Sequence, residues 1–90
     1  MRQITRTGAF KRDYKRINKA DASFDTLLIP VLKLLSSGAS LPPKLVDHPL
    51  GGNWKSYRDC HLKPDLLLIY KMDKETLTLA RLGSHSEIFG

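Results

Sequence analysis

Cysteine is nearly absent from this sequence of 90 residues, and long apolar runs are absent altogether. The single Cys60 has no partner for an internal disulfide, which fits a reducing compartment, and we expect the protein to be cytoplasmic. The longest apolar stretches, residues 27–35 and 66–70, are far too short to span a bilayer. The first seven residues include arginines but no apolar segment, so we expect neither a signal peptide nor a membrane partner.

Acidic residues are also scarce. Nine Asp and Glu stand against fifteen Lys and Arg, which gives a net charge of +6 and a pI near 9.7. Such a surface attracts a polyanion, and nucleic acid, an anionic membrane or an acidic protein would all fit. Many small domains are basic without binding nucleic acid, so charge alone does not choose among these partners. The hydrophobic fraction of 41% excludes a disordered tail, and residues 1–90 are predicted to form one folded domain.

The beginning of the chain is typical of a strand followed by a helix. Residues 2–6 suit a short strand, and Thr7 can cap the helix after it. The apolar stripe of that helix consists of Phe10, Tyr14 and Ile17. Its other faces carry a basic series: Lys11, Arg12, Lys15, Arg16 and Lys19. This series is either an ordinary solvated surface or a rail for phosphates, and the near absence of acidic residues within it favours the rail.

A second helix with a wide apolar face is predicted next, and it contains a proline. Proline inside a helix removes a hydrogen bond and crowds the preceding turn. The helix is therefore expected to begin between Ser23 and Thr26, which places Pro30 in its first or second turn; a kink is the alternative. Gly38 suits the left-handed residue that ends a helix. Residues 39–52 include three prolines and two glycines and are predicted to form an irregular connector.

The second half of the chain has the residue pattern of β-strands. Strands are predicted at residues 53–60, 66–72 and 76–82, with a turn at residues 62–64 and a short tail at residues 85–90. The order β-α-α-β-β-β predicts an α+β fold, with two helices packed on one face of a small antiparallel-rich sheet. The other face of the sheet would be open and could carry a site.

Three histidines, His48, His61 and His85, lie beside loops or strand ends and outside the apolar runs. Histidines and carboxylates can hold zinc, but the sequence has no H-x-x-H or C-x-x-C pair, so neither a metal nor another cofactor is expected. Cys60 and His61 are adjacent on a strand, so their side chains point apart and a Cys–His dyad is not expected either. The remaining possibility is acid–base chemistry by a histidine with a nearby aspartate.

RNA offers a reaction that needs only such groups. A base takes the proton of the ribose 2′-OH, which attacks the adjacent phosphate, and an acid protonates the departing 5′-oxygen. A cation stabilises the charge that develops around phosphorus. Four basic residues are candidates for that phosphate contact: Lys55, Arg58, Lys63 and Arg81. From spacing alone, an ordinary surface role fits each histidine as well.

Two stretches of the C-terminal half resemble a known family. They are D-H-P-L-G-G-N-W-K-S-Y-R-D-C-H-L-K-P-D-L-L-L-I-Y-K at residues 47–71 and R-L-G-S-H-S-E-I-F-G at residues 81–90. Both are similar to motifs of the YafQ branch of the RelE family, the toxins of type II toxin–antitoxin pairs. The resemblance implies a small endoribonuclease that cleaves mRNA in the A site of the ribosome without a metal. It also implies a RelB- or DinJ-like antitoxin as partner, with operator DNA bound only through the antitoxin complex.

The resemblance also implies which residues form the active site. The matching positions are His48, His61, Asp65, His85 and Phe89, with Asp59 as a weaker candidate. We expect His85 to protonate the leaving oxygen and His48 or His61 to take the 2′-OH proton. Asp65 would hold a histidine in its working tautomer. Phe89 would stack on a displaced base, although a C-terminal aromatic residue can also be a packing anchor. The competing hypotheses are a non-catalytic module that blocks the ribosome by occupancy and a metal-dependent nuclease.

Overall fold

The computed structural model describes every residue, 1–90, and its elements follow the predicted order with a few additions. They are β1 (Gln3–Arg6), α1 (Gly8–Ala20), α2 (Asp25–Ser37), η1 (Pro43–Leu45), β2 (His48–Pro49), η2 (Gly52–Trp54), β3 (Arg58–Lys63), β4 (Leu66–Met72), β5 (Thr76–Gly83) and α3 (His85–Phe89). The elements η1 and η2 are single turns of 3₁₀ helix. None of the helices has the length and apolar character that crossing a membrane requires.

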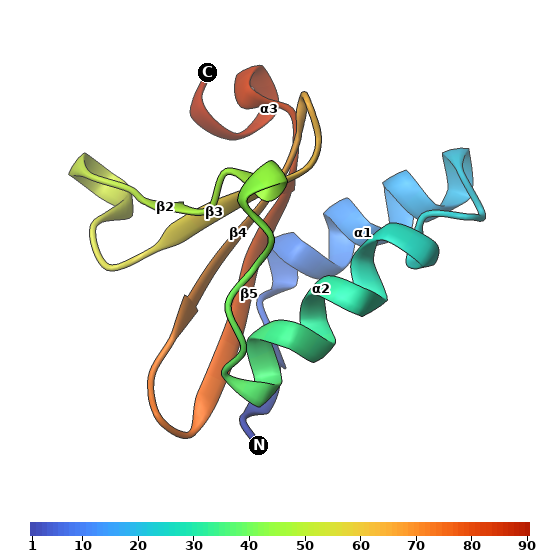
Figure 1. Ribbon diagram of the computed structural model, residues 1–90. Helices are drawn as coiled ribbons and strands as arrows, with labels where there is room; N and C mark the ends of the chain where they lie inside the picture. The colour runs from blue at the N-terminus through green and yellow to red at the C-terminus, as the bar shows by residue number, and fades with distance from the viewer.

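The five strands form one sheet in the order β1-β5-β4-β3-β2, in which only the β1–β5 pair is parallel. Helices α1 and α2 lie together on one side of this sheet, and α3 lies at the end of β5 far from the N-terminus (Figure 1). The predicted α+β fold is therefore confirmed, including the antiparallel-rich sheet and the helical pair on one face.

Apolar side chains pack on both faces of the sheet. The larger cluster joins α1 and α2 to the sheet and includes Phe10, Phe24, Leu28, Val31, Leu35, Cys60, Leu62, Leu68, Tyr70, Leu77, Leu79 and Leu82. A smaller cluster on the other face has Leu67, Ile69 and Ala80 at its centre, with Leu50, Trp54, Tyr57 and Ile88 packed around them. Strand β4 contributes to both clusters, as predicted for a central strand that is apolar on both faces. The smaller cluster lies on the same face of the sheet as His61, which pairs with Leu67.

The two long helices begin and end as the sequence predicts. Thr7 caps α1, because its hydroxyl accepts a hydrogen bond from the Phe10 N–H at 3.0 Å. Pro30 is the sixth residue of α2 and is exposed, so it lies in the second turn as predicted. Gly38 ends α2 at φ 81°, a left-handed conformation that glycine adopts without steric cost.

Three local predictions were wrong. The strand expected at residues 53–60 is η2 followed by β3, because Ser56 has φ 81° and a left-handed residue cannot continue a strand. Consequently β3 runs on to Lys63 and replaces most of the turn expected at residues 62–64. The connector contains the two-residue strand β2, and the tail forms α3.

Candidate active site

The three histidines stand in a row on the face of the sheet opposite α1 and α2. Cys60 and Leu62 of β3 pack toward the helices, so His61 between them points to the other face. His48 comes from β2 beside β3, and His85 is the first residue of α3. The ring centroids of His48 and His61 are 6.4 Å apart, and those of His61 and His85 are 5.7 Å apart. The structure thus brings together residues that lie far apart in the sequence.

Asp65 holds His85 from the turn between β3 and β4. Its Oδ1 accepts hydrogen bonds from the His85 backbone N–H at 3.1 Å and lies 2.8 Å from Nδ1 of the ring. These two contacts with His85, the side-chain one first, hold the pKa of Asp65 below its usual value. Because the ionised carboxylate can only accept, Nδ1 of His85 carries a proton, and Nε2 is the nitrogen left for chemistry.

His48 has a comparable arrangement with a buried partner. Its Nδ1 lies 2.9 Å from the carbonyl oxygen of Val46 and 3.0 Å from Oδ1 of Asp59. Asp59 is 2% exposed, and its Oδ1 lacks a well-aligned hydrogen bond. Burial raises the pKa of Asp59, against the opposing influence of His48 and His61. The fold therefore holds the carboxyl group of Asp59 out of contact with water and beside His48.

Aromatic side chains border the row at its His85 end. Phe89 is 43% exposed, and its ring centroid lies 6.3 Å from that of His85. Trp54 meets Phe89 edge-on at 6.4 Å and Tyr57 edge-on at 5.2 Å. Trp54 is half-buried over the smaller apolar cluster, whereas Phe89 presents a free face beside the histidines.

The four basic candidates differ in their surroundings. Arg58 pairs with Asp47 on the helix side of the sheet, with Nε–Oδ1 and Nη2–Oδ2 distances of 3.2 and 3.3 Å. Arg81 pairs with Asp13 of α1 at 2.6 Å. Lys63 approaches the carboxylate that follows α1, 3.8 Å from Asp21, and Lys55 is exposed after η2. Both arginines thus have a carboxylate partner that sequence spacing could not reveal, and their contact with the phosphate stays a prediction.

Comparison with known proteins decides the family. Residues 2–90 match the family model described as "Bacterial toxin of type II toxin-antitoxin system, YafQ". This chain belongs to the YafQ toxin family. The resemblance inferred from its two motif-bearing stretches is thereby confirmed, and it extends over nearly the whole chain.

Named members of the YafQ family are similar over their full length. The chain is 37% identical to "mRNA interferase toxin YafQ" of Escherichia coli strain K12, over 99% of this chain and 97% of that protein. It superposes on the toxin in the crystal structure of the E. coli DinJ–YafQ complex with a TM-score of 0.89, at 37% identity and full coverage of both chains. A metal-bound toxin from Helicobacter pylori gives a TM-score of 0.92 at 46% identity, covering 99% of this chain and 100% of the other.

The histidine row of this YafQ-family chain does not form a cluster of metal ligands. No group of three or more His, Cys, Asp and Glu side chains is arranged to hold a metal ion. The two outer rings direct Nδ1 toward protein oxygens, which leaves Nε2 as the free nitrogen of each ring. Cys60 adds nothing, because it is fully buried and burial raises the pKa of its thiol to about 12.

Sequence reasoning missed three residues that support the row. Asp47 anchors the segment that carries His48, while Arg16 and Glu87 join α1 to α3 by an ion pair of 3.0 Å. A readable signal existed for Glu87, since S-H-S-E at residues 84–87 has the spacing of a capping box. No comparable signal exists for Asp47, whose partners come from β3 and β4.

Proposed function

We propose that this toxin is an endoribonuclease that cleaves mRNA in the ribosomal A site by metal-independent acid–base catalysis. The observation that carries the proposal is the histidine row, in which each outer ring is held through Nδ1 and has Nε2 left for proton transfer. The name of the E. coli relative, an mRNA interferase, supports mRNA as the substrate. Attack by the 2′-OH needs only a base and an acid on opposite sides of the phosphate.

His48 is the base in this proposal. The carbonyl oxygen of Val46 can only accept a hydrogen bond, so the proton of the neutral ring sits on Nδ1. Nε2 then carries the lone pair that takes the 2′-OH proton. Asp59 lies 3.0 Å from Nδ1, and its negative charge stabilises the imidazolium that forms.

His85 is the acid, and His61 lies between the two. Asp65 accepts a hydrogen bond from Nδ1 of His85, so Nε2 is the nitrogen that delivers a proton to the departing 5′-oxygen when the ring acts as the acid. His61 lies between the two outer rings and would stabilise negative charge that develops on the phosphate. The four basic residues Lys55, Arg58, Lys63 and Arg81 remain candidates for the same role. Phe89 offers its exposed face to a base next to the cleaved bond.

A DinJ-like antitoxin, related to RelB, is the proposed protein partner. The structural relative from E. coli forms a complex with DinJ, and this chain covers that toxin completely. The net charge of +6 favours an acidic or amphipathic antitoxin segment. Operator DNA would be bound only through the antitoxin complex. An open reading frame for such an antitoxin beside the toxin gene, whose product suppresses growth arrest on coexpression, is the expected finding.

A translated message with a single 2′-deoxynucleotide at the cleavage position provides the direct test. Primer extension in a cell-free translation reaction should detect cleavage of the all-ribose message and none of the deoxy-substituted one. The His85→Ala variant should leave both messages intact while keeping the fold. Cleavage of the deoxy-substituted message would exclude 2′-OH attack.

The same reaction separates the two competing functions. If translation stops while the all-ribose message stays intact, the chain acts by occupancy and not by catalysis. A chelator selective for transition metals, with magnesium retained for the ribosome, should leave cleavage unchanged. Loss of cleavage that added metal restores would make this a metal-dependent nuclease. Cleavage of free RNA at low toxin concentration would exclude the dependence on the ribosome.

A further inference from the structure

Behind His48, on the helix side of the sheet, lies a polar network that the proposed reaction does not use. Asp47 accepts two hydrogen bonds from the Arg58 guanidinium of β3 and one from the hydroxyl of Tyr70 in β4. Tyr70 is fully buried, and burial together with the Asp47 hydrogen bond raises the pKa of its hydroxyl, so it stays a donor. Asp47 is thereby tied to two strands at once.

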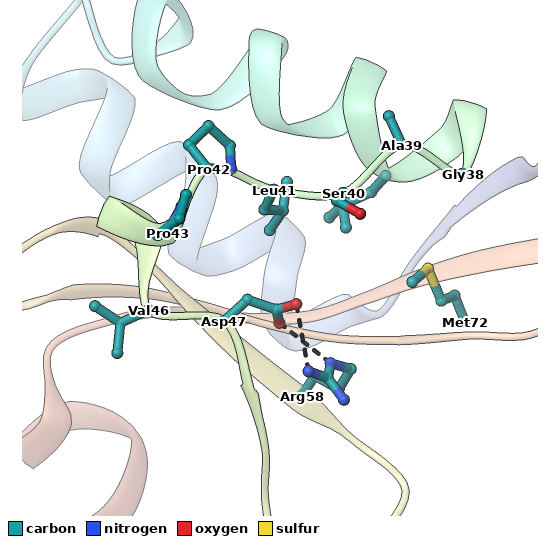
Figure 2. A pocket seen from close by; sticks show the side chains of 11 residues that line it. Gly38, Ala39, Ser40, Leu41, Pro42, Pro43, Val46, Asp47, Arg58 and Met72 are labelled. Atoms are coloured by element: carbon teal, nitrogen blue, oxygen red, sulfur yellow. Dashed lines mark hydrogen bonds and ion pairs between the residues drawn. The ribbon is translucent and has the colours of Figure 1, made fainter.

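The network borders a cavity of about 440 Å³ between the end of α2, the connector and the sheet. Figure 2 shows Asp47 and Arg58 pointing toward each other at the edge of this cavity, below the connector. Because successive strand residues point to opposite faces, Asp47 faces the cavity while His48 faces the reaction side. A substitution in the network therefore replaces none of the three histidine side chains.

The hydrogen bonds that hold Asp47 also bear on Val46, the residue before it. Val46 has φ 50° and ψ 44°, a left-handed conformation that is unfavourable for a β-branched side chain. In this conformation its carbonyl oxygen lies 2.9 Å from Nδ1 of His48. Strained residues persist only where surrounding contacts hold them. On one side Val46 is held by η1, through its N–H to Pro43 at 3.0 Å, and on the other by Asp47.

We propose that Asp47, held by Arg58 and Tyr70, is a positioning residue that keeps the Val46 carbonyl on His48 and so sets the tautomer of the base. This inference rests on the proposed function for the role of His48. Strand β2 is only two residues long and cannot fix the ring alone. Without the anchor, Val46 relaxes and Nδ1 loses its one aligned acceptor, because Oδ1 of Asp59, although 3.0 Å away, makes no hydrogen bond. The ring then samples the tautomer that has no lone pair at Nε2.

The Tyr70→Phe variant is the sharpest probe, because it removes one hydroxyl on the far side of the sheet. Tyr14→Phe is the matched control, since Tyr14 also donates to a carboxylate, Asp25 at 2.7 Å, away from the site. Nitrogen-15 spectra of the histidine rings, at a pH where they are neutral, report which nitrogen carries the proton. The wild type and Tyr14→Phe should show the His48 proton on Nδ1, and Tyr70→Phe a mixture. His85 should be unchanged in all three.

Cleavage activity should depend on the tautomer of His48. We expect kcat for Tyr70→Phe to fall roughly tenfold to a hundredfold with little change in KM, because a small misplacement of a catalytic group is enough for such a loss. Should Tyr70→Phe unfold, Asp47→Asn at nearly the same volume takes its place. An unchanged His48 tautomer in the folded variant overturns the inference, whether or not cleavage falls. A changed tautomer with full cleavage overturns it too.

Failure of the proposed function looks different. The wild type would then leave translated mRNA intact, while the ring spectra still decide whether the network controls His48.

Discussion

Asp59 is a carboxylate that the fold buries without aligning a hydrogen-bond donor to each oxygen. Buried charges cost stability unless they are paired, and such groups cluster at functional sites. Asp59 lies 3.0 Å from His48 and interacts through its charge with His61 and His85 as well. We interpret it as a group retained for its effect on His48 at the expense of stability.

The first prediction concerns Asp59→Asn, which removes this charge and nearly conserves volume. A carboxyl whose pKa is raised in the folded state costs stability once it is ionised, so the wild type loses stability as pH rises above the ordinary value of 3.8. The variant lacks this loss, and its thermal midpoint at neutral pH should lie above that of the wild type. Cleavage should nevertheless fall by roughly tenfold to a hundredfold, because His48 loses its negative neighbour.

Thermal unfolding at several pH values checks this, with the exposed Asp25→Asn as control. The advantage of Asp59→Asn should disappear below pH 3.8, where both forms are neutral. A lower midpoint for Asp59→Asn at neutral pH would mean that the ion pair with His48 outweighs burial.

The second prediction concerns Asp65→Asn. Asp65 is exposed, and its hydrogen bonds with His85 lower its pKa. The Asp65 carboxylate is therefore ionised at neutral pH, and its negative charge beside His85 is lost only as the pH falls below 3.8. The amide can accept the backbone N–H but cannot stabilise an imidazolium. Cleavage should fall by roughly a hundredfold or more, as when the orienting carboxylate of a catalytic histidine is neutralised. The thermal midpoint should hardly move.

Single-turnover cleavage at a fixed ribosome concentration measures the effect. Asp73→Asn is a useful comparison, because Asp73 also accepts backbone N–H groups in a turn but lies outside the site. If Asp65→Asn and Asp73→Asn cleave equally well, Asp65 has no role in proton transfer.

At this scale the sequence identified the candidate side chains that the structure brings together, but not the residues that support them. The histidines, Asp65 and Phe89 were candidates by residue type and family motif, and the structure places them side by side. The partners of Arg58 and Arg81 were not predicted, because charge type alone does not identify the carboxylate that a guanidinium will meet. Asp47 was missed for the same reason, since both of its partners are remote in sequence.

Among the elements, α3 presents two of the candidate site residues on a very short helix. It has five residues, presents His85 and Phe89, and has no buried residue. A helix this short is not stable by itself. It is held by the capping box of Ser84 and Glu87, by the pair of Glu87 with Arg16, and by Ile88 on the smaller apolar cluster.

The third prediction is that Ser84→Ala loosens α3 without unfolding the domain. Loss of an N-cap side chain costs about 1 kcal/mol, which lowers the ratio of docked to undocked α3 about fivefold and reduces cleavage by at most about that factor. Trp54, the only tryptophan, touches Phe89, so its emission should shift to the red as α3 moves away. Ser37→Ala at the end of α2 is the control and should change neither emission nor cleavage. Unchanged emission in Ser84→Ala would show that other contacts dock α3.

Element boundaries were predictable where a local signal determines them and not elsewhere. Thr7 and Gly38 mark the ends of α1 and α2 by chemistry that acts within a few residues. The start of β3 was misplaced because Ser56 adopts a left-handed conformation that its residue type does not require. Strand β2 was missed because two residues between prolines and glycines become a strand only by pairing with β3.

For the molecule as a whole, the larger apolar cluster and the histidine row lie on opposite faces of the sheet. The helix-facing side holds the larger apolar cluster and the Asp47 network, and the open side holds the histidine row on the smaller cluster. Segregation of two helices from three successive strands predicted this division from the order of elements alone. Charge is distributed separately, because the basic series of α1 lies on the exposed faces of that helix.

The last prediction tests whether this basic series serves binding and not chemistry. Lys11, Lys15 and Lys19 recur every fourth residue and are all exposed, so they line one side of α1. Replacing all three by Gln should weaken binding to the ribosome and reduce the salt dependence of binding by roughly 0.7 to 0.9 in logarithmic slope for each phosphate that a lysine no longer neutralises. Cleavage at saturating toxin should stay within about twofold, since none of the three contributes to the proton-transfer steps.

A second triple variant removes the same charge from other surfaces. Lys33, Lys44 and Lys74 are also exposed but lie on α2, on η1 and in the β4–β5 turn. If the α1 series is a phosphate rail, the first triple variant should lose much more affinity than the second at equal net charge. Equal losses would mean that only overall charge matters, because a field summed over the whole molecule does not depend on which lysines supply it.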